Sequence, residues 1–332
     1  MIILSVESSC DETAVAVTRG REVLSSEIFS QVDIHALYGG VVPEIASRNH
    51  IEVISRLADS AVSHAGISKT DIGGVAVTYA PGLVGALLVG VNFAKSAAYA
   101  LNVPLIPVHH IRGHIAANYI AYPELEPPFL CLIISGGHSL IVDVKSYTHM
   151  EIVGASRDDA AGECFDKAAR VLGLGYPGGV QMDKLAKGGD DRKYPLPRPV
   201  LTGSKYDMSF SGLKTNLINL LHNAQQKGEE IDKPSLAASF AAAVSDILVP
   251  RTAAAAKEKG YDKIVIAGGV AANSRIRRDF EMVAKKEGFT LYAPPLSLCG
   301  DNAAMIGCQG YYEYMAGIRG DTALNAFAVK GI

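Results

Sequence analysis

The sequence predicts an α/β protein of two similar lobes, and three observations point to that fold. Strand-like and helix-like segments alternate along the chain. A pair of strands joined by a short turn occurs near the start and again near the middle. A buried strand followed by a glycine-containing turn and a helix also occurs in each half. With 332 residues, the chain is long enough for two domains that each bury a core.

The first lobe is predicted over residues 1–125. Its expected elements are, in order, the strands Ile2–Val6, Ala14–Thr18 and Val23–Ser30, the helix Pro43–His64, the strand Gly74–Thr78, the helix Leu83–Leu101 and the strand Pro104–Val108. The first helix is indicated by apolar residues, among them Ile51, Ile54 and Leu57, that recur at the spacing of one helical face.

The second lobe is predicted over residues 126–332, with the final helix left free to pack back on the first lobe. Strands are expected at Phe129–Ile134, Ser139–Lys145 and Lys263–Ala267, and a helix is expected to begin at Ala271. The segment 173–232 between them is dense in glycine, proline and charge. Because a long irregular segment in a compact domain is usually functional or mobile, we interpret it as an insertion that forms one wall of a cleft.

The charge of the chain argues against a strongly basic nucleic-acid-binding protein. Lys and Arg number 31 against 34 Asp and Glu, which gives a formal net charge of −3. Residues 1–150 carry −5 and residues 151–332 carry +2. Any contact with RNA is therefore expected in the second half, with help from a partner. The basic residues there are concentrated in Lys184–Lys214 and Arg275–Lys286.

The sequence indicates a cytoplasmic protein without a membrane segment. Met1–Ser8 lacks the basic residues that begin a secretory signal. The longest apolar run, Pro81–Val91, is much shorter than the roughly 20 residues that span a bilayer. The five cysteines are scattered and form no CxxC pair, which is typical of buried thiols in a reducing compartment.

A histidine pair marks a candidate metal site. His110 and His114 are four residues apart, so on a helix both imidazoles leave the same face and can bind one metal ion. The motif differs from that of the zinc proteases, because Ile111 stands where those enzymes have a glutamate base. Spacing alone leaves the third ligand open, and a polar helix edge without metal is the alternative.

Two glycine turns favour a phosphate or ribose ligand. Ser135-Gly136-Gly137 lies between two predicted strands, and Gly268-Gly269 lies between a strand and a helix. Such turns allow backbone N–H groups to approach a phosphate closely. The sequence contains no P-loop, and its GxGxxG at Gly173–Gly178 follows a predicted helix, which argues against a dinucleotide-binding turn.

Acidic residues lie near these segments. Asp11 and Glu12 end the first hairpin, where a carboxylate can act as a base, although a solvated turn has the same sequence. Asp166 and Asp183 lie near glycine-rich sequence. Asp301 precedes a helical pattern, so a helix N-cap is the alternative to a ligand role.

Taken together, these segments resemble the TsaD/Kae1 family of tRNA adenosine threonylcarbamoyltransferases nearly from end to end. The matching motifs are Glu7–Ala14, Gly39–Arg48, Pro81–Gly85, Ser135–His138, Asp159–Glu163, Phe165–Ala168, Leu172–Gly179, Phe210–Thr215 and Gly268–Ser274. The resemblance implies an α/β fold of the ASKHA type, which is the two-lobed, duplicated RNase H-like fold of actin, Hsp70 and sugar kinases. It also implies an active site in the cleft between the lobes.

The resemblance further implies the residues of the site. His110, His114 and Asp301 would bind one divalent metal ion, Fe(II) or Zn(II). The residues implied to bind the adenylate substrate are Ile133, Ile134, Ser135, Gly136, Gly137, Asp166, Gly179, Asp183, Gly268, Gly269 and Asn273. Two positions depart from the family pattern, with Arg112 in place of a glutamate and Ala80 in place of a glycine. Arg112 is not a ligand position, but its charge is expected to affect how phosphate or RNA is held.

The implied reaction transfers the threonylcarbamoyl group from threonylcarbamoyl-adenylate to the exocyclic amine of the adenosine next to the anticodon. The tRNAs are those that read codons beginning with A, and AMP is released. A bound cation would neutralise the leaving group, and the glycine turns would hold its phosphate. The amine must lose a proton, and Glu12 is the expected base with Asp11 as second candidate. The implied partners are a TsaB-like paralogous subunit on the first lobe and a TsaE-like P-loop ATPase, and a homodimer is a further possible state.

Three other functions fit parts of the sequence. An ASKHA-type ATP-binding phosphotransferase would share the fold but would not require the histidine pair. A metallopeptidase would require the glutamate base that is missing here. A non-catalytic scaffold subunit would be expected to lack the metal histidines, so the transferase is the favoured function.

Overall fold

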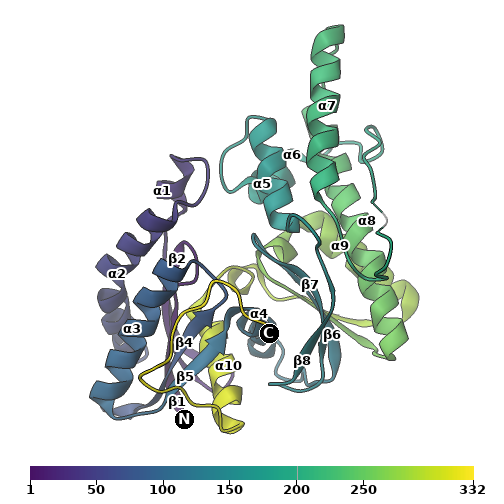
Figure 1. The fold of residues 1–332 in the computed structure, drawn as a ribbon. Coiled ribbons are helices and arrows are strands. Elements are labelled where there is room, and N and C mark those ends of the chain that lie inside the picture. Colours follow the sequence, from purple (N-terminus) through teal and green to yellow (C-terminus); the bar gives the residue numbers. More distant parts are fainter. Residues whose placement is uncertain (200) are drawn as a thin grey trace. The chain divides into compact units, whose positions relative to one another are not determined.

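The computed structural model describes residues 1–199 and 201–332, which form two compact units. Unit 1 consists of Met1–Pro127, Lys145–Met150 and Pro294–Ile332, and unit 2 consists of Pro128–Val144 and Glu151–Ala293. Each unit contains one five-stranded sheet with its own helices (Figure 1). The sequence placed residues 126–332 in the second lobe and left only the final helix free to join the first. In the structure the whole segment 294–332 packs in unit 1.

The sheet of unit 1 has the strand order β3-β2-β1-β4-β5. Its strands are β1 (Ile2–Glu7), β2 (Glu12–Arg19), β3 (Glu22–Ser30), β4 (Ile72–Ala80) and β5 (Leu105–His109). The first three strands are antiparallel, whereas β4 is parallel to both β1 and β5. All five lie where the sequence predicts strands, with ends that differ by one or two residues.

Helices cover both faces of this sheet. They are α1 (Val32–Ala36), α2 (Pro43–His64), α3 (Val84–Leu101), α4 (His110–Ala121) and α10 (Ala303–Met315), with short 3-10 helices at Lys69–Asp71 and Leu296–Leu298. On β1, Leu4 packs in the core formed with α2 and α3, whereas Ile3 packs with Ala117 of α4 and Met305 of α10. Because side chains alternate along a strand, this pattern places the two helix pairs on opposite faces.

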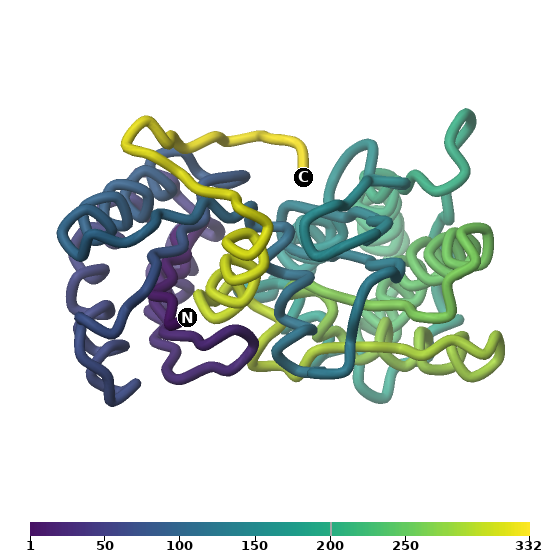
Figure 2. The backbone as a smooth tube through the Cα atoms, turned by 90° about the horizontal axis from the view of Figure 1, so that it is seen from below, coloured from purple at the N-terminus to yellow at the C-terminus, as the bar shows by residue number. Residues whose placement is uncertain are grey.

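The C-terminal segment, yellow in Figure 2, returns to the connection between β4 and α3. The backbone N–H of Phe327 donates to the carbonyl of Tyr79 at 3.0 Å. The N–H of Gly82 donates to the carbonyl of Ala328 at 3.3 Å. Residues that follow α10 therefore help to fix the loop that follows β4.

The sheet of unit 2 has the order β10-β9-β6-β7-β8. Its strands are β6 (Phe129–Ile134), β7 (Ser139–Val144), β8 (Met150–Ala155), β9 (Lys263–Ala267) and β10 (Thr290–Tyr292). The β6–β7 pair is antiparallel, and β9 is parallel to β6 and β10. Read from β8 to β10, this order repeats that of unit 1 strand for strand, which confirms the predicted duplication. The sequence analysis missed β8, which exposes Glu151 and Ile152, and β10, which has three residues.

The helices of unit 2 correct one prediction. They are α5 (Ala161–Val171), α6 (Gly178–Leu185), α7 (Ser211–Lys227), α8 (Lys233–Lys259) and α9 (Ser274–Glu287). Because α6 and α7 both lie inside 173–232, the expectation of an irregular insertion is wrong for these parts of the segment. The helix expected from Ala271 is a 3-10 helix over Gly269–Ala272, and α9 follows it with Asn273 as N-cap.

Two helices are long and apolar enough to cross a membrane by length and composition alone. The apolar window of α8 is 83% buried, as is usual for the core helix of a folded domain. That of α3 is 33% buried, and α3 packs against α2 and β4 in the core of unit 1. Both helices belong to folded units, so they are weak evidence for a membrane-spanning segment.

Candidate functional site

Unit 1 brings two histidines and an aspartate together as a candidate metal centre. His110 and His114 lie on the first two turns of α4, and Asp301 lies just before α10. One ligand atom from each lies within 4.8 Å of the others. Asp301 Oδ1 is 3.5 Å from His110 Nε2 and 3.3 Å from His114 Nε2. The predicted placement of both histidines on one helix is confirmed, and the structure places Asp301 beside them.

The chemistry of these three residues fits a divalent metal ion. His114 is buried, and neither of its ring nitrogens has a hydrogen-bond partner among the described residues. A buried polar atom without a partner is costly, and a metal ion near Asp301 would satisfy the Nε2 atom. Two imidazoles and one carboxylate form a donor set that suits zinc or iron.

The residue that caps α10 is Asn302, not Asp301. Asn302 Oδ1 accepts a hydrogen bond from the backbone N–H of Met305 at 2.9 Å. The alternative interpretation of Asp301 as the N-cap is therefore wrong, and its carboxylate is positioned beside the histidines.

A further carboxylate, Glu7, lies behind His110. Its side chain is buried at the end of β1, and Oε2 is 3.0 Å from His110 Nδ1. Burial alone would lower the pKa of His110, but Asp301 and Glu7 outweigh it and raise that pKa to about 9 in the metal-free protein. Burial would likewise raise the pKa of Glu7, but His110 holds it below its ordinary value. The sequence analysis did not assign Glu7, although it opens the first family motif.

The two candidate bases lie where β1 turns into β2, with Asp11 in the turn and Glu12 as the first residue of β2. Asp11 is 6% exposed, so the alternative of a solvated turn is wrong for this residue. His50 of α2 forms two hydrogen bonds at this turn. Its Nε2 is 3.0 Å from the carbonyl oxygen of Cys10, and its Nδ1 is 2.7 Å from the hydroxyl of Thr13.

Glu12, the expected base, lies in surroundings that favour the protonated form of its carboxyl. Burial, followed by the charges of Asp301 and Asp11, raises its pKa to about 9. A protonated carboxyl cannot accept a proton, so the base role requires that the charge of Asp301 be offset. A cation bound to Asp301 would have that effect.

Unit 2 brings its implied ligand residues together at the ends of β6 and β9. Gly268 has φ +91°, and a Cβ on it would lie 2.5 Å from the carbonyl oxygen of Ile134, so this close approach requires glycine. A Cβ on Gly162, in the first turn of α5, would lie 2.5 Å from the carbonyl oxygen of Ser135. Ile133 and Ile134 are buried, so only their backbone is suited to contact a ligand. Beyond them Gly136 and Gly137 are exposed, with open space on the side where a side chain would project.

Three polar side chains connect the helices around these loops. Asp166 Oδ1 accepts hydrogen bonds from the first two N–H groups of α6, those of Gly178 and Gly179, at 2.7 and 3.2 Å. Asp183 Oδ1 accepts from the N–H and hydroxyl of Ser274 at 3.1 and 2.7 Å. Asn273 caps α9. These residues therefore hold helix N-termini in place.

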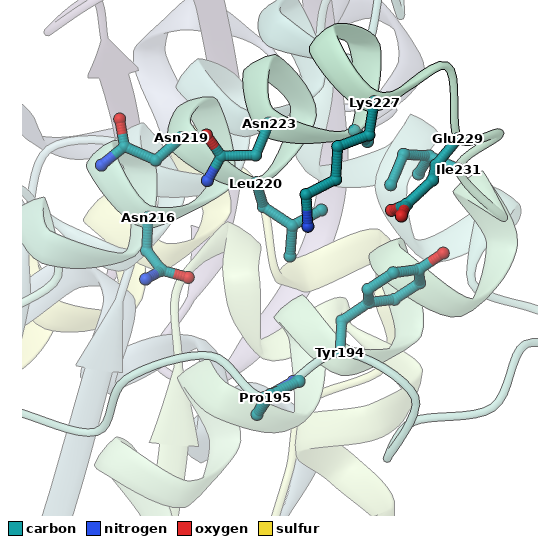
Figure 3. A pocket seen from close by; sticks show the side chains of 10 residues that line it. Tyr194, Pro195, Asn216, Asn219, Leu220, Asn223, Lys227, Glu229 and Ile231 are labelled. Atoms are coloured by element: carbon teal, nitrogen blue, oxygen red, sulfur yellow. The ribbon is translucent and has the colours of Figure 1, made fainter.

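Two cavities lie in unit 2. One of about 310 Å³ is lined by Asp183 and Ser274 together with Arg275 and Arg278, and so adjoins the loops described above. The other, of about 360 Å³, is shown in Figure 3. Its lining residues are Tyr194, Pro195, Asn216, Asn219, Leu220, Asn223, Ala224, Lys227, Glu229 and Ile231. None of the implied ligand residues lines this second cavity.

Ion pairs compensate many charges in the two basic stretches. Arg275 pairs with Asp191 and Asp279, with Nε 2.6 Å from the Asp279 carboxylate. Lys193, Arg198 and Lys205 pair likewise with acidic residues. At the end of α9, Lys285 and Lys286 are exposed and form no ion pair with the described residues.

Comparison with known proteins places this arrangement in a family. The model of TsaD, described as tRNA N6-adenosine threonylcarbamoyltransferase, matches residues 22–308. The chain belongs to the TsaD family. A protein of that description from Clostridioides difficile (strain 630) is 51% identical over 327 residues, covering 98% of this chain and 97% of the relative. A relative from Clostridium botulinum (strain Hall) is 52% identical over 325 residues, with 98% and 96% covered.

Solved structures with low sequence identity match the fold of this TsaD family member. HypF in its phosphate- and nucleotide-bound form gives a TM-score of 0.62 at 16% identity, covering 95% of this chain and 46% of HypF. Component A of the (R)-2-hydroxyglutaryl-CoA dehydratase of Acidaminococcus fermentans gives 0.54 at 15% identity, with 95% and 99% covered. At these identities the matches show the fold alone, and they confirm the predicted ASKHA class.

Proposed function

We propose that this chain catalyses the transfer for which its family is named. The exocyclic amine of the adenosine next to the anticodon forms a bond to the carbamoyl carbon of threonylcarbamoyl-adenylate. The bond from that carbon to the phosphate oxygen breaks, AMP leaves, and the amine loses one proton. The observation that supports the proposal is that the side chains of His110, His114 and Asp301 lie close together in unit 1. A phosphotransferase of the same fold, or a scaffold subunit, would not require it.

In this proposal the residues of unit 1 bind the metal and move the proton. A divalent ion, Fe(II) or Zn(II), held by His110, His114 and Asp301 would neutralise charge that develops on the leaving phosphate. Glu12 accepts the amine proton, and Asp11 is the second candidate. The raised pKa of Glu12 supports a role in proton transfer, because a carboxylate with a raised pKa is a stronger base than an ordinary glutamate.

The residues of unit 2 hold the adenylate in this proposal. The backbone of Ile133 to Gly137 and of Gly268-Gly269 approaches the substrate, since these loops combine exposed glycines with closely packed strand ends. Asp166, Asp183 and Asn273 fix the helix N-termini that flank the loops, and the first of these lies beside Gly179. A helix N-terminus favours an anionic group such as the phosphate.

We further propose that the chain works in the cytoplasm with a TsaB-like subunit and a TsaE-like ATPase. Unit 1 exposes the apolar side chains of Leu37, Tyr38 and Ile51 by 84%, 60% and 64%. Large exposed apolar side chains near one another in sequence suit a protein partner. Co-elution with the partner subunit should be lost in a Tyr38→Asp variant, and retained co-elution would count against this surface.

Reconstitution tests the proposed reaction. The purified chain, its partner subunits, threonylcarbamoyl-adenylate and unmodified tRNA are expected to give the modified nucleoside and one AMP per transfer. The His110→Ala/His114→Ala variant should lose this turnover with its fold intact by circular dichroism. His64→Ala is the matched control, because this exposed histidine of α2 pairs with Glu27. Undiminished turnover by the metal-free double variant would contradict the metal role.

A further inference from the structure

We infer that Glu7 is a positioning residue for the metal centre, because its carboxylate accepts the Nδ1 proton of His110 and thereby presents Nε2 to the metal ion. This inference rests on the metal site proposed above. It adds a residue that neither the histidine spacing nor the motif resemblance singled out.

The two ring nitrogens of His110 face different groups. Nδ1 is 3.0 Å from Glu7 Oε2, whereas Nε2 is 3.5 Å from Asp301 Oδ1. A carboxylate can only accept a hydrogen bond, so a neutral imidazole in this contact carries its proton on Nδ1. Its lone pair is then on Nε2, the nitrogen nearest the other metal-binding residues. The hydroxyl of Ser9, 3.2 Å from Nδ1, is a second neighbour that can accept the same proton.

Glu7 itself is held firmly. Its side chain is fully buried, Oε1 accepts a hydrogen bond from the N–H of Ser9 at 2.6 Å, and Oε2 accepts one from the hydroxyl of Thr78 at 2.6 Å. Ser9 is packed in turn against the connection after β4, where a Cβ on Gly82 would lie 2.5 Å from the carbonyl oxygen of Ser9. An acceptor fixed in this way sets both the tautomer and the ring orientation of His110.

The second histidine lacks such support. In the described part of the chain, neither ring nitrogen of His114 has a hydrogen-bond partner. Its ring packs edge-on against the ring of His110, with centroids 4.6 Å apart. The orientation of His114 therefore depends on that of His110, and a loss of Glu7 is expected to loosen both ligands.

The test is the rate at which Zn(II) leaves the full-length protein into an excess of chelator. Glu7→Gln is expected to raise this rate about 10- to 100-fold. The dissociation rate is measured in place of the affinity, because His110 carries no proton on Nε2 once the metal is bound. Competition between protons and Zn(II) for that nitrogen therefore does not mask the effect of Glu7→Gln. Asp143→Asn is the matched control, since Asp143 is a buried acid of unit 2 that accepts from Tyr261 and pairs with Lys259.

The outcomes separate this inference from the proposed function. If His110→Ala speeds the loss of Zn(II) and Glu7→Gln changes it no more than Asp143→Asn does, the role of Glu7 is overturned and the metal site stands. If His110→Ala holds Zn(II) as the unmutated protein does, the metal site itself fails.

A second measurement covers the case in which Glu7→Gln does not fold. Nitrogen NMR of the unmutated, Zn(II)-loaded protein should show His110 with a proton on Nδ1 and with Nε2 bound to the metal. A metal-bound Nδ1 would overturn the inference.

Discussion

Acidification should weaken metal binding by at least about tenfold per pH unit below the pKa of His110. Burial opposes the charged imidazolium, but Asp301 and Glu7 outweigh it and raise the pKa of His110 to about 9. A metal ion binds the neutral imidazole and must displace this proton. Relative to a fully neutral imidazole, binding at about pH 7 is therefore about 100-fold weaker, or about 2.7 kcal/mol, for His110 alone.

The measurement is a competition between the protein and a chromophoric chelator for Zn(II) at several pH values. The expected slope lies between one and two protons, because a cation beside Asp301 also lowers the pKa of Glu12. The Glu12→Gln variant removes that second contribution and should give a slope of about one. Calorimetry in two buffers that differ in ionisation enthalpy counts the same protons independently. An affinity that does not change over this range would refute the reasoning, since His110 would then be neutral before metal binds or would not be a ligand.

Three further predictions follow from unit 2 and from the base. Gly268→Ala should lower the free energy of unfolding, measured in urea, by about 2–3 kcal/mol, because Gly268 has a positive φ and closely approaches Ile134. Gly269→Ala should change the free energy of unfolding by well under half as much. Equal effects of the two substitutions would contradict the packing argument. The transfer rate should rise with pH and level off below about pH 9, because burial raises the pKa of Glu12 while a cation bound at Asp301 offsets the charge of that residue. Glu12→Gln should abolish this dependence, and a Glu12→Gln enzyme with the same pH profile would exclude Glu12 as the base. Reversing the charges of Lys285 and Lys286 should weaken tRNA binding and reduce its salt slope by about 0.7 per lost phosphate contact; an unchanged slope would assign the RNA contacts to the partners.

The sequence predicted those parts of the fold in which the pattern is local. The strands of unit 1 alternate strongly or are continuously apolar, and all five were predicted. The strand β8 was missed because two of its central side chains are exposed, and β10 because it is short. The helices α6 and α7 were not predicted, because the glycines and prolines around them indicate loops more strongly than their apolar residues indicate helices.

The site was predictable to the extent that it lies on one helix or in one motif. The spacing of His110 and His114 predicts a shared metal ion. Asp301 came only from family resemblance, because the whole of unit 2 lies between it and the histidines in the sequence. Glu7 was missed for a physical reason. At the end of a buried strand its partners, among them Thr78 and His110, come from other elements and are set by tertiary packing.

The distance in sequence between the metal ligands has a consequence for how unit 1 is assembled. The histidines enter unit 1 before the chain passes through unit 2, and Asp301 arrives only with the closing segment Pro294–Ile332. A chain still in synthesis therefore lacks the third ligand until its last part emerges. Full metal affinity would then be reached only when unit 1 is complete. The bound ion would link the C-terminal segment to α4, as a covalent cross-link does. Amide hydrogens of α10 should accordingly exchange more slowly with metal than without it.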